Sequence, residues 1–515
     1  MMKPFLRTYD RNGSQYVYEV TPYVDQATGK VRQRSKYLGK KVDGKVEKVR
    51  MALPRRSFDY GDVLLAYHAM RDLRLDEDVY RLLPTEKARC VLALAFGRVL
   101  EKCSLGNTKL WYQGTILAKK WGDLPLSSSA IGELLPRLGD SSVMEELCDS
   151  LLRRWGSGSP LLYDLTAFSG SSSSLDLMEY GDQYRRTGLP QVNMSIIAHK
   201  DLGIPLSLRA YPGSIPDVSL LRGEVERLKA LGLQAPTLIM DRGFHSTTNV
   251  ELLVKEKFDF IMPASSSFKE VRSLISQASK GLAVHDNYRQ HEGEGIFVKD
   301  VRLSTGPVDG FLFYDPASEA EESYGFHLRL EEALRRLQAR EVRRWERPML
   351  VFSETARDMG QFIRYKVVNG RFQTTVRDKA VAQHLNRAGK FVLMDNGRHG
   401  WKECLTWYRQ RDGIEKMFMS LKNDLAASPL RVQGRESLLG AALVNFLALL
   451  IRCRLLAMMR SAELCRKRSL PALFLLMGAL GIVEMADGTM RIDQITAQQR
   501  AALKALNIDI NMLCA

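Results

Sequence analysis

The region from residue 156 to residue 264 constrains the fold most strongly, because short β-rich runs alternate there with helical patterns. In chain order these segments are PLLYDLTAF, VNMSIIAH, IPLSLRAY, the helical VSLLRGEVERLKALG, PTLIMD, the helical TTNVELLVKEK and FDFIMPA. The KDLG sequence between the second and third runs predicts a hairpin turn. Three strands, a helix, a strand, a helix and a strand in this order predict a mixed α/β sheet.

Two further regions precede this sheet. Residues 1–56 contain YVYEVTPYVDQATGKVRQRSKYL, which predicts a basic β-hairpin around a DQATGK turn. Residues 57–155 show apolar side chains at spacings of three and four, which predicts a helical region and a candidate DNA-binding domain. Within it, LPLSSSAIGELLPRLG predicts a short helix with caps among Ser127 to Ser129, either the second helix of a helix-turn-helix or a packing helix.

The chain after the sheet divides into three parts. Residues 265–400 mix the strand-like runs IFVKDVRLS and DGFLFYD with a highly charged helix, and they are expected to form an insertion domain. GKFVLMDNG then predicts one more strand, which leads into residues 401–456, expected to rejoin residues 156–264 in one catalytic domain. A helical C-terminal tail is expected at residues 457–515. The apolar runs LLGAALVNFLALLI and LPALFLLMGALGIV are shorter than the ~20 residues that span a bilayer, so they predict buried helices.

The chain is basic. Lysine and arginine (75) exceed aspartate and glutamate (59) by 16, which favours a polyanionic partner. Nine cations lie within the 21 residues from Lys30 to Arg50, which suits either a phosphate-tracking surface or an edge strand protected against self-pairing. The seven cysteines are scattered and show no CxxC spacing, and the N-terminus has no apolar signal core. Neither a disulfide framework nor a zinc finger is predicted, and a reducing cytoplasm is expected.

Two aspartates follow apolar runs in the predicted sheet: Asp164 in LLYD and Asp241 in LIMD. Aspartates at the ends of neighbouring strands can lie close together, where each raises the free-energy cost of ionising the other unless a cation lies between them. A pair of magnesium ions ~3.5 to 4 Å apart would relieve this repulsion and would serve phosphodiester chemistry. Either aspartate alone could instead cap the next turn. His245, four residues after Asp241, is within reach of a scissile phosphate in this scheme.

The helix expected after residue 400 carries WYRQRDGIEKMFMSLKNDL, with Tyr408, Arg411, Glu415 and Lys422. At ~100° per residue these four side chains fall within one narrow stripe. A carboxylate beside a phenol, a guanidinium and an ammonium suits a phosphate backbone and a metal site that Glu415 completes. The alternative is a solvated helix face with ion pairs such as Arg411 with Glu415.

With these motifs in this order, the sequence resembles the DDE transposases of bacterial insertion sequences, in the group marked by a Tyr-x2-Arg-x3-Glu-x6-Lys signature. YDLTAF and MDRGFHS resemble the first and second aspartate motifs of that group, although the first runs on into a serine tract, SGSSSSLD. The resemblance covers most of residues 15–455. It implies a ribonuclease-H-like catalytic fold with a largely β insertion between Asp241 and Glu415.

Carried over residue by residue, the resemblance implies that Asp164, Asp241 and Glu415 are the catalytic carboxylates. They would bind two magnesium ions, for which manganese can substitute.

The same resemblance implies that Tyr408, Arg411 and Lys422 contact DNA phosphates near the cleaved end. The expected activity is that of a transposase, which binds the terminal inverted repeats of its element and performs metal-dependent cleavage and strand transfer. Its partners would be double-stranded DNA of the repeats and of the target, and a second copy of the chain, with the C-terminal tail as a dimer contact. The expected location is the bacterial cytoplasm at the nucleoid, with no membrane.

Two alternatives remain open from the sequence. A domesticated, non-catalytic DNA-binding protein would bind DNA whether or not magnesium is present. A structure-selective nuclease of the same fold would cut DNA without needing its own terminal repeats.

Overall fold

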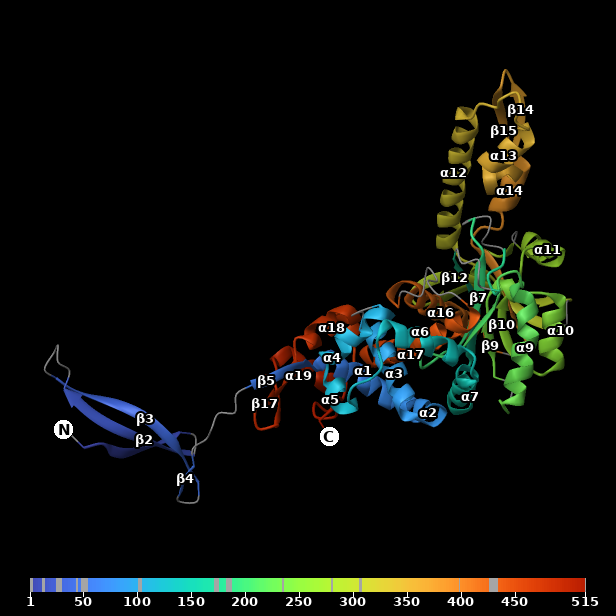
Figure 1. Cartoon of the computed structure of the whole chain (residues 1–515). Coiled ribbons are helices and arrows are strands. Elements are labelled where there is room, and N and C mark those ends of the chain that lie inside the picture. Colours follow the sequence, from blue (N-terminus) through green and yellow to red (C-terminus); the bar gives the residue numbers. More distant parts are fainter. Residues whose placement is uncertain are drawn as a thin grey trace.

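A computed structural model provides the structure of the chain. It describes residues 3–11, 14–24, 30–42, 45–47, 54–100, 104–170, 176–181, 188–233, 236–278, 281–304, 308–397, 399–425 and 434–514. The predicted DQATGK turn and the serine tract SGSSSSLD fall largely outside these residues. Figure 1 shows an N-terminal sheet that stands to one side, a central body of helices and strands, and a projection that rises from this body around α12.

A nine-stranded mixed sheet forms one half of the central body. Its strand order is β11-β12-β13-β16-β10-β9-β6-β7-β8. β7 lies antiparallel to both β6 and β8, whereas β9 runs parallel to β6 and to β10. The strands are β6 (Leu161–Ser169), β7 (Gln191–His199), β8 (Ile204–Pro212), β9 (Leu238–Met240), β10 (Phe260–Pro263), β11 (Tyr288–His291), β12 (Glu294–Leu303), β13 (Val308–Tyr314) and β16 (Lys390–Asp395).

The predicted order of elements from residue 156 to residue 264 is confirmed. α9 (Asp217–Ala230) precedes β9, and α10 (Thr247–Lys255) lies between β9 and β10. KDLG forms the turn between β7 and β8, where Gly203 has a φ of 62° and its N–H donates to the carbonyl of His199 at 2.9 Å. β7 is buried over its whole length, as expected of a central strand with both faces covered.

The segment 265–400, expected to be a largely β insertion, is more helical than the sequence analysis predicts. After α11 (Lys269–Ala278), β11, β12, β13 and β16 extend the central sheet through antiparallel pairing of β16 with β10. A separate subdomain with its own buried core lies between β13 and β16. It contains α12 (Pro316–Ala339), α13 (Pro348–Ala356), β14 (Ile363–Val368), β15 (Arg371–Val376) and α14 (Asp378–Leu385). The expectation was wrong because α12 has a helical apolar stripe that continues over 24 residues.

The helical region predicted at residues 57–155 forms the other half of the central body. It contains α1 (Gly61–Asp72), α2 (Leu75–Leu82), α3 (Thr85–Val99), α4 (Thr108–Gln113), α5 (Ile116–Trp121), α6 (Ser128–Gly139) and α7 (Val143–Trp155). α17 (Arg435–Ser461) runs through this region and contacts α1, α3, α6 and β8. By length and composition α17 could cross a membrane, but 72% of its most apolar window is buried inside the protein. The apolar run in α17 is therefore a core segment, as predicted.

α6 and α17 approach each other closely at two glycines. A Cβ atom on Gly440 would lie 2.0 Å from the carbonyl oxygen of Leu135, and one on Gly139 would lie 1.8 Å from that of Glu436. Ser127 caps the N-terminus of α6 as predicted. The apolar face of α6 is covered by α17, as the packing explanation of this helix predicts. The helix-turn-helix explanation stays a prediction, because a DNA-reading helix also packs one face on its own domain.

The C-terminal tail packs back onto the helical region. β5 (Pro54–Asp59) pairs with β17 (Gly481–Met485), and β17 pairs with β18 (Met490–Ile492). The tail therefore contains strands as well as the helices α18 (Leu470–Gly478) and α19 (Ala497–Ala505).

The predicted N-terminal hairpin is confirmed as part of a larger sheet. The strands β1 (Phe5–Arg11), β2 (Ser14–Val24), β3 (Val31–Val42) and β4 (Lys45–Glu47) pair antiparallel in that order. Two of its side chains, those of Val17 and Val20, are buried, and neither belongs to the two large cores of the chain.

Candidate active site

Asp164 and Asp241 lie side by side on adjacent parallel strands. β6 and β9 pair in register up to Tyr163 opposite Met240, so the two aspartates occupy the next position of the two chains. The expectation that each aspartate ends its strand is confirmed for Asp241, because β9 stops at Met240. It is wrong for Asp164, because β6 continues to Ser169 through its pairing with β7.

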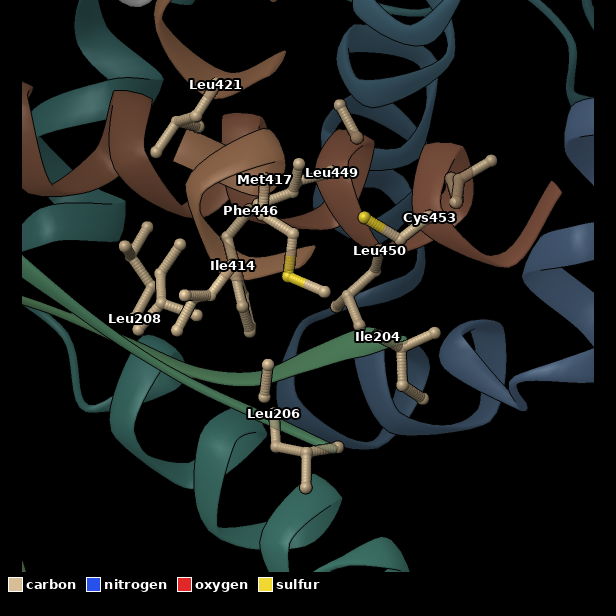
Figure 2. Packing of buried hydrophobic residues seen from close by; sticks show 14 of the residues in the cluster. Ile204, Leu206, Leu208, Ile414, Met417, Leu421, Phe446, Leu449, Leu450 and Cys453 are labelled. Carbon is tan, nitrogen blue, oxygen red and sulfur yellow. The ribbon is translucent and has the colours of Figure 1, made fainter. Parts of the chain in front are cut away.

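The predicted helix forms as α15 (Trp401–Gln410), α16 (Asp412–Met419) and η6 (Ser420–Asp424), a π-helical turn. Arg411, between α15 and α16, keeps right-handed helical angles of φ −55° and ψ −27°, so the helical direction continues through it. Figure 2 shows Ile414, Met417 and Leu421 packed among side chains of β8 and α17. At ~100° per residue these core side chains lie roughly 100° to 160° around the helix from Glu415. Their burial therefore fixes the rotation of α16 and keeps Glu415 out of the core.

The guanidinium of Arg411 lies among three carboxylates. Its Nη1 is 3.2 Å from Oδ2 of Asp164, and its Nη2 is 2.6 Å from Oε1 of Glu415 and 3.9 Å from Oδ1 of Asp241. The side chains of Arg411 and Asp164 are 14% and 13% exposed, whereas those of Asp241 and Glu415 are 42% and 50% exposed. The structure thus brings together the three carboxylates that the sequence analysis selects, from three separate segments, with two of them open to solvent.

Lys422 and Tyr408 extend this arrangement along the helix. Nζ of Lys422 donates a hydrogen bond of 2.6 Å to Oγ1 of Thr166 and lies 5.1 Å from the ring centre of Phe168. The guanidinium carbon of Arg411 lies 5.6 Å from the ring centre of Tyr408. Two members of the predicted stripe, Arg411 and Lys422, therefore contact β6, whereas the ring centre of Tyr408 lies 6.5 Å from that of Phe391 in β16.

Thr166 and Phe168 belong to this site, although the sequence analysis does not select them. Asp164, Thr166 and Phe168 alternate along β6, so they project from the same face of the strand. That period of two is a signal in the sequence that could have identified both residues.

The electrostatics of the site depend on the burial of Asp164. Burial raises the pKa of the Asp164 carboxyl to about 7, although the nearby Arg411 guanidinium and the Leu165 N–H lower it. Burial lowers the pKa of Arg411, but Asp241, Asp164 and Glu415 outweigh it and hold that pKa above its usual value. Burial lowers the pKa of the Lys422 ammonium. Ionisation of Asp164 therefore carries the largest free-energy cost in the cluster, and a positive charge beside this carboxyl favours its ionised form.

The donor set fits a hard divalent cation. Asp164, Asp241 and Glu415 offer carboxylate oxygens, the ligands that magnesium and manganese prefer. Three carboxylates around one guanidinium also carry more negative charge than that guanidinium balances. These three residues could hold such an ion.

A second group with ligand atoms within 4.8 Å of one another is Asp395, His399 and Cys404. The Asp395 carboxylate already accepts the backbone N–H groups of Gly397 and His399, at 3.0 and 2.7 Å, and lies 2.8 Å from Nδ1 of the His399 ring. These contacts order the turn before α15. We therefore interpret this group as part of a structural turn. The three carboxylates around Arg411 are the candidate active site.

His245 does not join the carboxylates in a comparable way. Its Nδ1 accepts the backbone N–H of Ser265 at 2.7 Å, and its ring lies against that of Phe268 with 4.3 Å between the centres. The residue is 7% exposed, and burial lowers the pKa of its imidazole. These contacts are those of a packing residue.

We expect the affinity of the DNA-free protein for a divalent cation to rise with pH through neutrality. Because the Asp164 carboxyl has a pKa of about 7, an ion that binds below that pH must displace its proton. The apparent affinity should therefore fall about tenfold for each pH unit below 7 and level off above it. Titration with Mn²⁺ at pH 6 and pH 8 measures this, and Asp164→Asn should flatten the profile. Equal affinity of the wild-type protein at both pH values would contradict the expectation.

A comparison with protein-family models identifies the family of this chain. The family model described as "Transposase DDE domain" matches residues 159–451, more than half of the chain and a range that includes the three carboxylates and Lys422. A cryo-EM structure of the piggyBac transposase synaptic complex with hairpin DNA is similar, with a TM-score of 0.39 and 10% identity over 88% of this chain and 82% of that chain. Among curated proteins, none matches the sequence.

Proposed function

Since the chain belongs to the transposase DDE domain family and is thus a DNA transposase, we propose that Asp164, Asp241 and Glu415 form its site for cutting and joining DNA. The observation that carries this proposal is the convergence of the three carboxylates on the guanidinium of Arg411. The three carboxylates come from a strand, a strand end and a helix. If the helix only presented a solvated face, nothing would require Glu415 to lie near Asp164 and Asp241.

We further propose a ribonuclease-H-like fold for the catalytic domain and membership of the group with the Tyr-x2-Arg-x3-Glu-x6-Lys signature. The order β8-β7-β6-β9-β10 supports the fold, because β7 pairs antiparallel with both of its neighbours while β6, β9 and β10 run parallel. Contacts of Arg411 and Lys422 with β6 residues or their neighbours support the signature.

Transposases of this family depend on divalent metal ions, and ions held by Asp164, Asp241 and Glu415 would supply activation of the attacking oxygen and charge stabilisation at the phosphodiester. The chain's own side chains position the DNA. Thr166 holds the ammonium of Lys422 beside the cluster, where it can bind a phosphate oxygen. Burial raises the pKa of the Tyr408 phenol, so the neutral hydroxyl remains a hydrogen-bond donor. Fixed positioning and charge of this kind are the main needs of phosphoryl transfer.

In the proposed reaction, water first attacks a phosphorus atom at the end of the element, and the 3′-oxygen leaves and takes up a proton. The released 3′-hydroxyl then attacks a phosphorus atom of the target and loses its proton. The target's own 3′-oxygen leaves that phosphorus and takes up a proton, so one bond to phosphorus forms as another breaks. The protein would bind the terminal inverted repeats of its element for both steps, as a homodimer that holds two ends.

The test uses the full-length protein with duplexes that carry the terminal repeats flanking its gene. We expect Mg²⁺-dependent nicks at the repeat ends and products in which those ends are joined to a second duplex. Cutting of unrelated duplexes at the same rate would instead identify a structure-selective nuclease. Binding that is indifferent to Mg²⁺, with no cutting, would identify a non-catalytic DNA-binding protein.

Lys422→Gln should weaken binding of the end duplex by about tenfold to a hundredfold. The reason is the loss of one charge-assisted hydrogen bond to phosphate, worth ~1.5–3 kcal/mol. Fluorescence anisotropy with the end duplex measures the change, while affinity for Mn²⁺ should stay as in the wild type.

Lys416→Gln provides a matched control in the same helix. The Lys416 side chain is 72% exposed and pairs with Asp412 at 2.5 Å, away from the carboxylate cluster. Equal losses of DNA affinity in the two variants would show that Lys422 contributes only general charge.

A further inference from the structure

Positive charge is concentrated in the N-terminal sheet formed by β1 to β4. Residues 1–50 contain 12 lysines and arginines against 5 aspartates and glutamates, a net charge of +7, whereas the whole chain has +16. Nearly half of the excess thus lies in a tenth of the chain. The contacts of the proposed active site involve none of these residues, so that site does not explain the concentration.

Three of these cations form a row on one face of the sheet. Arg32, Arg34 and Lys36 alternate along β3 with Gln33 and Ser35, so the three cationic side chains project from the same side of the strand. All three are exposed. Two strand residues span about 6.6 Å, so the row presents a positive charge at regular intervals. We refer to Arg32, Arg34 and Lys36 as the cationic face.

Neighbouring residues of β2 shape this face. Tyr23, Thr21 and Glu19 lie opposite Arg32, Arg34 and Lys36, respectively. The guanidinium carbon of Arg34 lies 5.5 Å from the ring centre of Tyr23, which is a stabilising cation–π distance. Among these six paired residues, Glu19 contributes one negative charge against three positive charges, so they carry a net charge of +2.

The opposite face of the sheet is aromatic and is occupied by its own contacts. The ring of Tyr18 lies 5.4 Å from that of Tyr9 and 5.2 Å from that of Tyr37, and Tyr16 lies 6.3 Å from Tyr37. Val20, two residues after Tyr18 on the same side of β2, is buried. These contacts stabilise the aromatic face of the sheet from within the chain.

We propose that the cationic face binds the sugar–phosphate backbone of duplex DNA, at a place separate from the catalytic carboxylates and without reading the bases. The argument is charge complementarity, since each phosphate that a lysine or arginine neutralises releases condensed counterions and favours binding. Phosphate contacts position a protein on DNA but carry no sequence information. This inference rests on the proposed function for the identity of the polyanion as DNA.

The competing explanation is that β3 carries cations only to prevent self-pairing. β4 pairs with β3 at Lys40 to Val42, and among the strands that the structure describes none pairs with residues 31 to 39 of β3 on that side. Charged side chains do protect such edges. The two explanations differ in what should follow when the three cations are neutralised. If they only protect the edge, the variant protein should self-associate. If they bind DNA, the affinity of the variant for DNA should depend less on the salt concentration.

The experiment is the salt dependence of DNA binding by the full-length triple variant Arg32→Gln/Arg34→Gln/Lys36→Gln. Binding to the end duplex is measured in EDTA, so catalysis plays no part. Three lost phosphate contacts should reduce the slope of log K against log salt concentration by about 2.7, and a scrambled duplex should show the same reduction.

Two further variants isolate the cause. Arg137→Gln/Arg302→Gln/Arg466→Gln removes the same charge at side chains that are 67%, 71% and 81% exposed elsewhere on the chain, and it should change the slope by less than one unit. Arg32→Lys/Arg34→Lys keeps the charge of the face and should keep the wild-type slope. A loss in the Gln variant that the Lys variant does not share then reflects charge and not unfolding of the sheet.

An unchanged slope in the Gln triple variant would overturn the inference, and so would self-association of that variant at wild-type DNA affinity. Tighter binding of duplex RNA than of duplex DNA through the same residues would overturn it as well. A variant that still binds with the wild-type slope while the wild-type protein cuts its ends would leave the proposed function intact. Conversely, loss of slope in a protein that never cuts DNA would leave this inference intact and reject the catalytic proposal.

Discussion

Replacing Asp164 with asparagine should reduce DNA cleavage and strand transfer by about 10³-fold or more, as is usual when a central catalytic group is removed. Asparagine keeps the shape of the side chain and one acceptor oxygen but loses the negative charge that a divalent cation requires. Asp241→Asn and Glu415→Gln should have effects of the same order, because the three carboxylates act on one site. Single-turnover cleavage of an end duplex in Mg²⁺ measures all three.

The Asp164 variant should remain folded, so the lost activity can be assigned to chemistry. The carboxyl has a pKa raised to about 7 in the folded protein, from a usual value of 3.8. A carboxyl with a raised pKa contributes most to stability at low pH, and that contribution is lost as the pH rises towards 7. At pH 8 the asparagine variant should therefore have a melting temperature no lower than that of the wild type.

Asp412→Asn is the matched control for the three variants. Asp412 begins α16, is 58% exposed and pairs with Lys416 on the solvent side. Its loss should leave cleavage within about twofold of wild type, since exposed ion pairs contribute little. Wild-type rates in all three carboxylate variants would remove the basis of the proposed mechanism.

Gly440→Ala should destabilise the protein by about 2 kcal/mol or more, although alanine favours helix over glycine by ~1 kcal/mol. The new Cβ would lie 2.0 Å from the carbonyl oxygen of Leu135. That oxygen belongs to the backbone of α6, so the clash is relieved only if α6 and α17 move apart. Such a movement opens the core that orients α16 (Figure 2). Thermal unfolding followed by circular dichroism measures the loss.

Gly132→Ala, in the facing helix α6, is the control for Gly440→Ala. A Cβ on Gly132 would meet nothing within 4 Å. Only the helix preference then remains, so this variant should be stabilised by about 1 kcal/mol. If the two substitutions change the free energy of unfolding in opposite directions, the loss in Gly440→Ala is due to the contact between α6 and α17. Changes in the same direction would contradict the close approach of the two helices.

Much of the site could be predicted from the sequence because its signals are local or periodic. The stripe of Tyr408, Arg411, Glu415 and Lys422 follows from helical spacing alone, and the structure brings Arg411 and Lys422 into contact with β6. The order of strands and helices between residues 156 and 264 could also be predicted, because each apolar run is short and bounded by turns. The roles of the site residues remain predictions that the variants above address.

Other features depended on contacts between distant segments. β6 continues past Asp164 because its later residues pair with β7, and no local pattern marks that pairing. The π-helical turn that contains Lys422 also lacks a local signature. In the N-terminal sheet, by contrast, the sequence analysis predicts only the central hairpin, although local signals mark two more. β1 pairs with β2 from Arg11 opposite Ser14, and β3 pairs with β4 from Val42 opposite Lys45. The Asn-Gly and Asp-Gly dipeptides between these pairs are typical of hairpin turns and could have identified both.

The subdomain between β13 and β16 leaves and rejoins the sheet at neighbouring positions. Tyr314 at the end of β13 pairs with Lys390 at the start of β16, and everything from α12 to α14 lies between them with a core of its own. The entropic cost of closing the sheet at this point grows only slowly with the length of the inserted segment. The subdomain can therefore open and re-form as a separate cooperative unit, which would exchange its amide hydrogens independently of the nine-stranded sheet. In evolution it can likewise be lengthened or replaced while the carboxylates of β6, β9 and α16 keep their positions.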